Sequence, residues 1–416
     1  MKNKIIAIVS VILVFLVVLS IGVSAITYET TVDISTNNFL VYNLNTSTVV
    51  YEKNVYDERT LSNLSVIMNA LVVCDTVTDP DNTKITISES VLSKIYNSDN
   101  TLDKYVDQEL SVTDLMTIMM ITDGNDAAYV LADYITNGDQ NVFLDMMKNK
   151  ANELGCDMSN FVSVCPTNSS DQYSSCADIL QIMKAALKYD SFRTASNASS
   201  FSINKEKGAE EEPDIETNNS IKKYSSPYYY SYVHESKFSY DVNAGQNIVA
   251  VSKYSNIEYI YIGLDGRNES ELNVFNDVKH MISFVYTKLK DAKMLGNGSE
   301  IGTALTDTDF NQKVVPLTVS KDLVLTLPND YVSSDLEYKY EYPERVPLPV
   351  YVGQNVGVGR VYFKGEQISR FNVVANANYG TDLLHDTSDI ISNMFNQLMP
   401  LEPTEETSES TVAPSE

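Results

Sequence analysis

Serine is the first residue type in this chain that could do covalent chemistry, and its surroundings limit what it can do. A serine hydroxyl attacks a carbonyl only when a nearby base accepts its proton, and a lysine one helical turn away can serve as that base. Ser62 and Ser65 lie where a buried helix is predicted, but no lysine occurs between Lys53 and Lys84. Neither serine therefore has a lysine partner along its own helix.

Histidine and cysteine indicate no stronger site. The three histidines are too scattered to suggest a Ser-His-Asp triad, so we expect surface or capping roles for His234, His280 and His385. The four cysteines form no C-x-x-C pair and have no histidine at zinc-ligand spacing; they are Cys74, Cys156, Cys165 and Cys176. We therefore predict no metal and no cofactor. Cys74 reads as a core residue. If the chain is exported from the cytoplasm, a disulfide among the other three cysteines would be permitted.

The elements that must position these residues alternate between strands and helices. The predicted elements are strands at 39–42 and 49–51, a buried helix at 61–73, helices on both sides of Gly124 within 112–136, strands at 247–251 and 259–262, and a helix at 272–290. The charged segment 205–219 contains Gly208 and Pro213, which predicts an exposed, mobile insertion. Residues 30–292 are thus predicted to form one domain.

Short strands separated by turns follow the first domain. Runs at 323–327 and 359–363 are typical of a small all-β domain, which we place at 299–378. Gly357 and Gly359 are predicted to form a turn or bulge in that domain rather than a phosphate loop. No internal repeat is evident.

Both ends of the chain carry tethering signals. Lys2 and Lys4 precede a long apolar run and a small-residue cleavage site, so residues 1–25 are predicted to be a signal peptide or an uncleaved membrane anchor. Residues 381–399 predict an amphipathic helix that lies on a membrane or docks on the protein. Residues 400–416 hold five Glu and no Lys or Arg, which predicts an acidic disordered tail.

The charge balance excludes one class of partner. With 30 Lys plus Arg against 56 Asp plus Glu, the formal net charge is -26. Such a surface repels phosphate backbones, so nucleic acid is not an expected partner. Attachment to an anionic membrane would need an apolar anchor such as the two terminal segments.

The order of segments from about 35 to 378 resembles the D-alanyl-D-alanine carboxypeptidases among the low-molecular-weight penicillin-binding proteins. The resemblance rests on the opening hairpin, on Ile67-Met68-Asn69-Ala70-Leu71, on Gly124-Asn125-Asp126-Ala127-Ala128 and on the β-rich segment at 347–375. It implies an α/β (α+β) penicillin-binding, β-lactamase-like transpeptidase fold followed by a small all-β sandwich. It also implies peptidoglycan stem peptides as partners, at the outer face of a bacterial cell envelope.

Members of that family use the motifs S-x-x-K, S-x-N and K-T-G. The first falls on Asn63-Leu64-Ser65-Val66, so that Asn63 replaces the nucleophile and Val66 the general base. The second falls on Asp123-Gly124-Asn125, where a carboxylate replaces a hydroxyl and the amide of Asn125 is retained. The resemblance therefore implies two motifs whose acyl-transfer groups are missing.

The third motif falls on Lys237-Phe238-Ser239, where the lysine survives but Phe238 stands at the position of a carboxylate-binding hydroxyl and Ser239 at that of a glycine. An arginine that many members use for the substrate carboxylate is replaced by Val274. We expect Asp123 and Lys237 to lie within about 6 Å and to form a salt bridge in the substrate-carboxylate pocket.

Three functions remain open from the sequence. The preferred one is a catalytically inactive homologue that binds peptidoglycan peptides or an envelope partner. The second is an active serine-type carboxypeptidase that removes terminal D-alanine through Ser62 or Ser65. The third is a structural spacer or interaction protein. The tyrosine-rich run from Tyr224 to Tyr232 is predicted to be a half-buried strand edge or, alternatively, a surface for glycan or partner binding.

Overall fold

The computed structural model of the chain describes residues 32–95, 101–166, 169–203, 215–267, 273–308 and 312–380. The described residues form two compact units, one of residues up to 292 with 325–333 and one of residues 293–324 with those from 334 onward. The predicted signal or anchor at 1–25, the helix at 381–399 and the tail at 400–416 lie outside the described residues.

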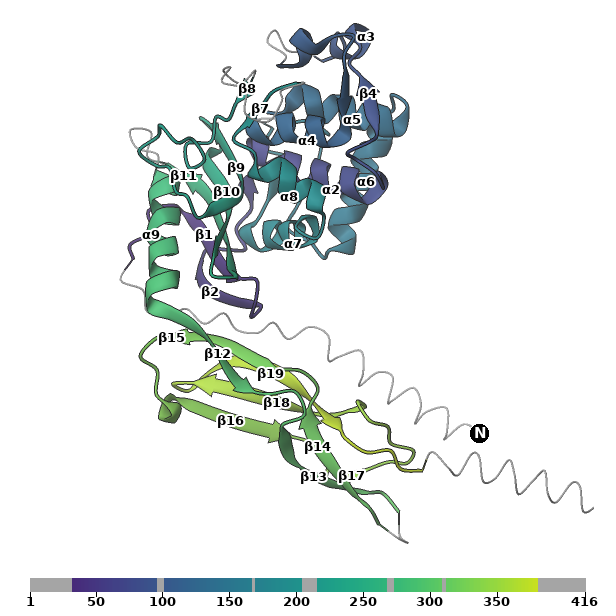
Figure 1. The fold of residues 1–416 in the computed structure, drawn as a ribbon, viewed down its shortest axis with the longest axis vertical. Coiled ribbons are helices and arrows are strands. Elements are labelled where there is room, and N and C mark those ends of the chain that lie inside the picture. Colours follow the sequence, from purple (N-terminus) through teal and green to yellow (C-terminus); the bar gives the residue numbers. More distant parts are fainter. Residues whose placement is uncertain are drawn as a thin grey trace, which may run out of the picture. The chain divides into compact units, whose positions relative to one another are not determined.

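The first unit is built on a five-stranded antiparallel sheet (Figure 1). Its strands, in spatial order, are β2 (Thr48–Lys53), β1 (Asn38–Asn43), β11 (Ile257–Gly266), β10 (Gly245–Tyr254) and β9 (Val233–Asp241). Helix α9 (Asn273–Lys288) packs on β10 and β11, and α7 (Cys176–Ala186) packs on β1 and β11. Most residues of the central strands are buried because helices cover both faces of the sheet. Strand β9 forms one edge.

A helical region lies against this sheet and surrounds α2, whose residues 66–74 are all buried. The region comprises α2 (Val66–Thr76), α3 (Glu89–Leu92), α4 (Val112–Ile121), α5 (Asn125–Thr136), α6 (Gln140–Glu153), α7 and α8 (Asp190–Asn197). Three short strand pairs border it: β3 (Arg59–Thr60) with β6 (Tyr173–Ser174), β4 (Lys84–Thr86) with β5 (Glu109–Ser111), and β7 (Ser200–Phe201) with β8 (Ile215–Glu216). A capping box between Ser111 and Asp114 fixes the start of α4.

The second unit is all-β. Its six-stranded sheet follows the order β16 (Leu336–Glu341), β18 (Asn355–Phe363), β19 (Glu366–Ala375), β14 (Val314–Val319), β13 (Glu300–Thr306) and β17 (Arg345–Val346). Strands β12 (Leu289–Leu295) and β15 (Leu323–Pro328) pair in a separate two-stranded sheet, and the division between the units falls within both strands. The pairing of β18 with β19 shifts register between Asn355 and Gly357, as the bulge prediction required.

The mixed α/β unit followed by an all-β unit confirms the predicted fold class, and three details differ from the sequence predictions. Residues 62–65 form a 3₁₀ turn, so the predicted 61–73 helix begins only at Val66. The predicted 272–290 helix ends at Lys288. The tyrosine run at 224–232 lies in turns rather than in a strand. All four cysteines are free.

The predicted insertion also needs correction. Residues 204–214 lie outside the described residues, but 215–219 are folded against the helical region. Ile215, Thr217 and Asn219 are buried, and the backbone N–H of Asn218 donates to the carbonyl of Ile121 at 3.1 Å. This part of the segment is therefore packed into the folded domain through alternate residues, not an exposed loop.

Candidate active site

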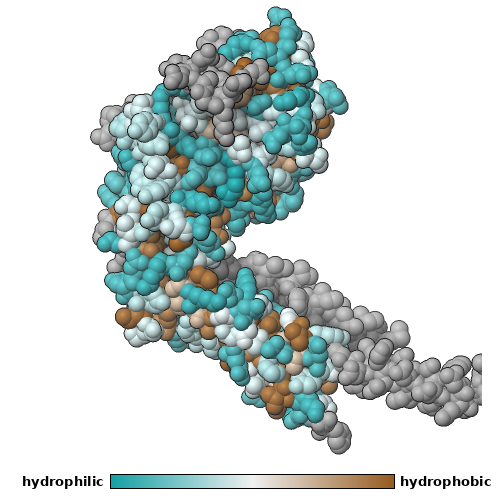
Figure 2. All heavy atoms as spheres, viewed as in Figure 1, coloured by the Kyte–Doolittle hydropathy of each residue, from teal (hydrophilic) through white to brown (hydrophobic). Residues whose placement is uncertain are grey.

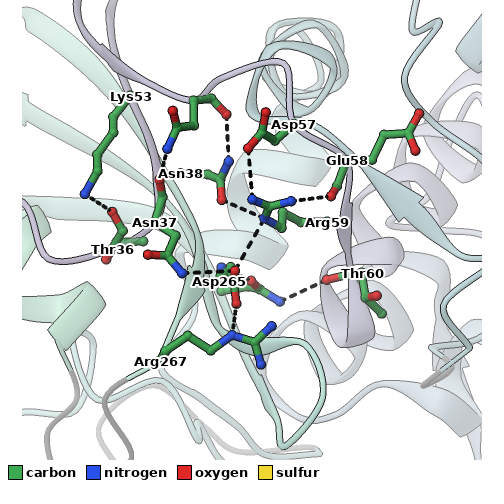
Figure 3. Close-up of polar contacts among 12 residues, drawn as sticks. Thr36, Asn37, Asn38, Lys53, Asp57, Glu58, Arg59, Thr60, Asp265 and Arg267 are labelled. Atoms are coloured by element: carbon green, nitrogen blue, oxygen red, sulfur yellow. Dashed lines mark hydrogen bonds and ion pairs between the residues drawn. The ribbon is translucent and has the colours of Figure 1, made fainter.

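The segment that carries Asn63 is held by a polar network at the ends of three strands (Figure 3). The Arg59 side chain donates to Asn38 Oδ1 at 2.8 Å, and its Nε lies 3.4 Å from Asp265 Oδ2. Asn247 donates to the carbonyl of Thr60 at 3.3 Å and accepts the backbone N–H of Asp265 at 2.9 Å. The strands β1, β10 and β11 thereby fix β3, the short strand just before the 3₁₀ turn.

The first and second motif positions meet through a direct hydrogen bond. Asn63 donates from Nδ2 to Asp123 Oδ1 at 2.8 Å. Asn218 donates from its own Nδ2 to the same oxygen at 3.0 Å. We call these three residues the amide–carboxylate cluster. Asp123 and Asn218 are exposed and Asn63 is half-buried, so the cluster lies at the protein surface.

Gly124 fixes the close approach of the second motif to α2. Its φ of +81° lies in the left-handed region, and a Cβ at this position would lie 2.7 Å from the Met119 carbonyl oxygen and 3.3 Å from Val66 Cγ1. Val66 is fully buried. The Val66 side chain therefore fills space directly beneath the turn that presents Asp123.

Lys237 is buried beneath the same turn, with 1% of its surface exposed. Its Nζ donates to the carbonyls of Met119 at 3.0 Å, Met120 at 3.3 Å and Thr122. These carbonyls end α4, where a helix lacks internal donors for its last oxygens and its dipole favours a cation. Lys237 thus caps α4 from the edge strand of the sheet.

The predicted salt bridge between Asp123 and Lys237 is wrong. Within the described part of the chain, these two residues form no ion pair. The lysine is occupied by main-chain carbonyls, and the carboxylate is occupied by two amides. Burial lowers the pKa of Lys237 to about 7, and the charge of Asp123 acts in the opposite direction. The two groups therefore interact only through the field of the carboxylate.

The other residues of the third motif point in opposite directions along β9, as alternate residues of a strand must. Ser239 donates to the Leu61 carbonyl at 3.4 Å, on the side of the 3₁₀ turn. The ring of Phe238 lies 4.7 Å from that of Phe275 on α9, where Val274 is also fully buried. The structure therefore brings Asn63, Asp123 and Lys237 together and places Phe238 and Val274 in the packing of α9.

The remaining predicted site residues are Asn125 and the two fallback serines. Asn125 is the first residue of α5, and its Oδ1 is buried without a hydrogen-bond donor among the described residues. Ser62 and Ser65 are each 2% exposed, and the Ser65 hydroxyl donates to the Ser62 carbonyl at 3.1 Å. Neither hydroxyl is at the surface.

Asn218 is the member of the cluster that sequence analysis missed. It lies at the end of a charged segment whose composition indicates a loop, and an exposed asparagine has no distinctive spacing. A possible signal was Ile215 followed by Thr217, an alternation of buried residues that is typical of a short strand.

Other features of the described surface do not add to this site. A pocket of about 340 Å³ lies in the helical region and is lined by Lys84, Ile85, Thr86, Ser88, Val91, Val130, Asp133 and Tyr134. Hydrophilic residues cover most of the first unit in the view of Figure 2. Among the described residues, no group of three His, Cys, Asp or Glu side chains could hold a metal ion, and no helix could cross a membrane.

Comparison with known proteins identifies the family of the chain. Residues 24–268 match the D-alanyl-D-alanine carboxypeptidase family, and residues 290–381 match the penicillin-binding protein 5 C-terminal domain. The D-alanyl-D-alanine carboxypeptidase DacF of Bacillus subtilis (strain 168) is 22% identical over 338 residues, which is 79% of this chain and 82% of that protein.

Solved structures share the fold. Penicillin-binding protein 5 from Haemophilus influenzae superimposes with a TM-score of 0.69 at 20% identity, covering 84% of this chain and 99% of that chain. A peptidoglycan synthesis regulatory factor (PBP3) from Streptococcus pneumoniae gives 0.62 at 16% identity, covering 83% and 100%. Because the first family match spans more than half of its residues, this chain belongs to the D-alanyl-D-alanine carboxypeptidase family.

Proposed function

We propose that this chain is a non-catalytic member of its family that binds peptidoglycan stem peptides through the amide–carboxylate cluster. The hydrogen bond between Asn63 and Asp123 carries the proposal. It joins the positions that the resemblance assigns to the nucleophile and to the second motif's hydroxyl. In place of a reactive serine and its proton relay, these positions hold an amide and a carboxylate that are hydrogen-bonded to each other.

The chemistry of acyl transfer supports this proposal. A nucleophile needs a group that loses its proton to a base, and a neutral side-chain amide is not such a group. At the position of the base, Val66 offers only methyl groups and is fully buried. At these two positions the chain therefore has no hydroxyl oxygen that could form an ester with a substrate.

The fallback serines favour the same conclusion. Ser62 and Ser65 are buried, and the Ser65 hydroxyl already donates to a main-chain carbonyl. Lys53 donates to the carbonyls of Ile34 and Thr36. Lys237 donates to three carbonyls of α4 and the following turn. Both lysines are thus engaged in main-chain contacts instead of accepting a serine proton.

Covalent labelling with a fluorescent penicillin tests the proposal. The full-length chain is incubated with the penicillin beside an active carboxypeptidase, and label is sought by gel fluorescence and intact mass. We expect no label on the folded chain, because an acyl-enzyme needs the missing hydroxyl and base. Label that maps to Ser62 or Ser65 would establish the active carboxypeptidase instead.

A double substitution tests how far the site has diverged. Asn63→Ser with Val66→Lys restores the first motif, yet we expect no measurable release of D-alanine. Asp123 would still oppose the substrate carboxylate, and Lys237 would still be bound to α4. Turnover by this variant would show that the rest of the machinery is intact.

Peptide binding separates the remaining alternatives. A spacer or interaction protein should not bind stem peptides, whereas the proposed function requires it. We place the protein at the outer face of the cell envelope, secreted or held by residues 1–25 or 381–399. Cleavage of the first segment is measurable as the mass of the protein recovered from cells.

A further inference from the structure

The amide–carboxylate cluster presents mainly acceptors to solvent. Asn63 and Asn218 both direct an amide N–H to Asp123 Oδ1. Within the described part of the chain, no donor contacts Asp123 Oδ2 or the side-chain oxygens of the two asparagines. The cluster therefore offers one carboxylate oxygen and two amide oxygens against one remaining N–H on each of the two amides, and its formal charge is negative.

The nearby lysines are engaged elsewhere. Lys237 is buried on the carbonyls at the end of α4. In the segment that follows Asn218, Lys223 lies 3.1 Å from Glu216, and Lys222 donates to Asn197 Oδ1 at 2.8 Å and to the His234 carbonyl at 2.7 Å. The contacts of these lysines are therefore internal to the protein and leave the charge of Asp123 facing outward.

A further hydrogen-bond acceptor belongs to the residue two positions after Asp123. Asn125 Oδ1 is buried, and no described residue donates a hydrogen bond to it. A buried acceptor without a donor is unfavourable in the free protein. Asn125 therefore adds a further acceptor without a partner close in sequence to Asp123.

We propose that this site selects a peptide end that carries a primary ammonium group and rejects one that carries a free carboxylate. The inference rests on the proposed function and names its ligand class. An ammonium offers three N–H donors and a positive charge, which match a carboxylate and unpaired amide oxygens. A terminal carboxylate offers acceptors only and would be repelled by Asp123.

The test uses three synthetic peptides of one sequence that end in D-Ala-D-Ala as the free carboxylate, the primary amide or the 2-aminoethyl amide. Binding to the full-length chain is measured by fluorescence anisotropy at low and at physiological salt. We expect the aminoethyl amide to bind about tenfold more tightly than the carboxylate at low salt, with the amide between them. The difference should shrink as salt screens the exposed charge.

Matched variants assign the effect to Asp123. Asp123→Asn keeps the shape of the side chain and should bring the three affinities within about twofold of one another. Asp145→Asn, which removes an exposed carboxylate from α6, should leave the tenfold preference intact. Circular dichroism confirms that each variant is folded.

The outcomes separate the inference from the proposed function. Equal binding of the three peptides, or tighter binding of the carboxylate, overturns the charge selection while peptide binding stands. A preference that survives Asp123→Asn overturns the assignment to this cluster. Failure of the folded chain to bind any of the three peptides overturns both the inference and the proposed function.

Discussion

The buried layer and the exposed layer of this site are held by different forces. Beneath the surface, the end of α4 is held against α2 and β9 by packing and main-chain hydrogen bonds that involve Lys237, Val66 and Gly124. At the surface, Asn63, Asp123 and Asn218 are joined by two hydrogen bonds between side chains.

This difference separates the residues that maintain the fold from those free to serve a ligand. Interior contacts are close-packed, and a buried polar group without a partner is strongly unfavourable. Surface hydrogen bonds compete with water and contribute little to stability. The lysine of the third motif has thus become part of the scaffold, whereas Asn63 and Asp123 from the first two motifs remain available to solvent.

The largest expected effect comes from Gly124→Ala. An alanine there would have to adopt a left-handed conformation, and its methyl group would lie 2.7 Å from the Met119 carbonyl oxygen. We expect the free energy of unfolding, measured with urea, to fall by about 3 kcal/mol. Gly155→Ala is the matched control, since its φ is +70° and nothing lies within 4 Å. A similar loss in both variants would show that backbone strain alone matters.

Removal of the buried lysine should have the next largest effect. Lys237→Met leaves three carbonyls at the end of α4 without their donor, although it also removes the unfavourable burial of a charge. We expect a net loss of about 2 kcal/mol in the free energy of unfolding. Lys148→Met, at an exposed position on α6, should change it by less than about 0.5 kcal/mol. An equally stable Lys237→Met would mean that the cap is dispensable.

These buried contacts also show what the sequence could and could not predict. Short apolar runs predicted β1, β2, β10 and β11, and Gly124 correctly marked the break between α4 and α5. The resemblance also brought positions 63, 123 and 237 into one region. The partners of Lys237 were wrong because main-chain carbonyls have no signature in a sequence, and their availability depends on where a helix ends.

The surface cluster was predicted less completely. Its third member, Asn218, was assigned to a mobile insertion because its neighbours are charged. Only the folded chain brings it to Asp123, 95 residues away. The 3₁₀ turn at 62–65 was also missed, because no Pro or Gly separates it from the helix that follows and the segment therefore reads as one continuous helix from Leu61.

The stability of the protein should depend on pH through Lys237. Its folded-state pKa of about 7 lies below the ordinary value of 10.5, so the unfolded chain binds more protons between these values. The free energy of unfolding should therefore rise from pH 7 to 8.5, by at most about 1.4 kcal/mol per pH unit.

Other groups define the useful pH window for that measurement. Burial lowers the pKa of Lys222 to about 8, which adds to the rise in stability. Burial raises the pKa of Cys74 to about 11 from 9.0, so this thiol lowers stability above about pH 9. Urea titrations at pH 7 and 8.5 on the natural chain and on Lys237→Met isolate the lysine. A rise of the same size in both proteins would assign the pH dependence to other groups.

The smallest effect should come from the surface cluster, and two adjacent asparagines allow a matched comparison. Asn218→Ala removes an exposed hydrogen bond to Asp123 and should change the free energy of unfolding by less than about 0.5 kcal/mol. Asn219→Ala removes a buried amide that donates to Ser236 Oγ at 2.9 Å and accepts from the Ile221 N–H at 3.3 Å, and should lower it by about 2 kcal/mol. If the two losses were equal, Asn218 would belong to the scaffold, and the amide–carboxylate cluster could not be regarded as a surface that is free to serve a ligand.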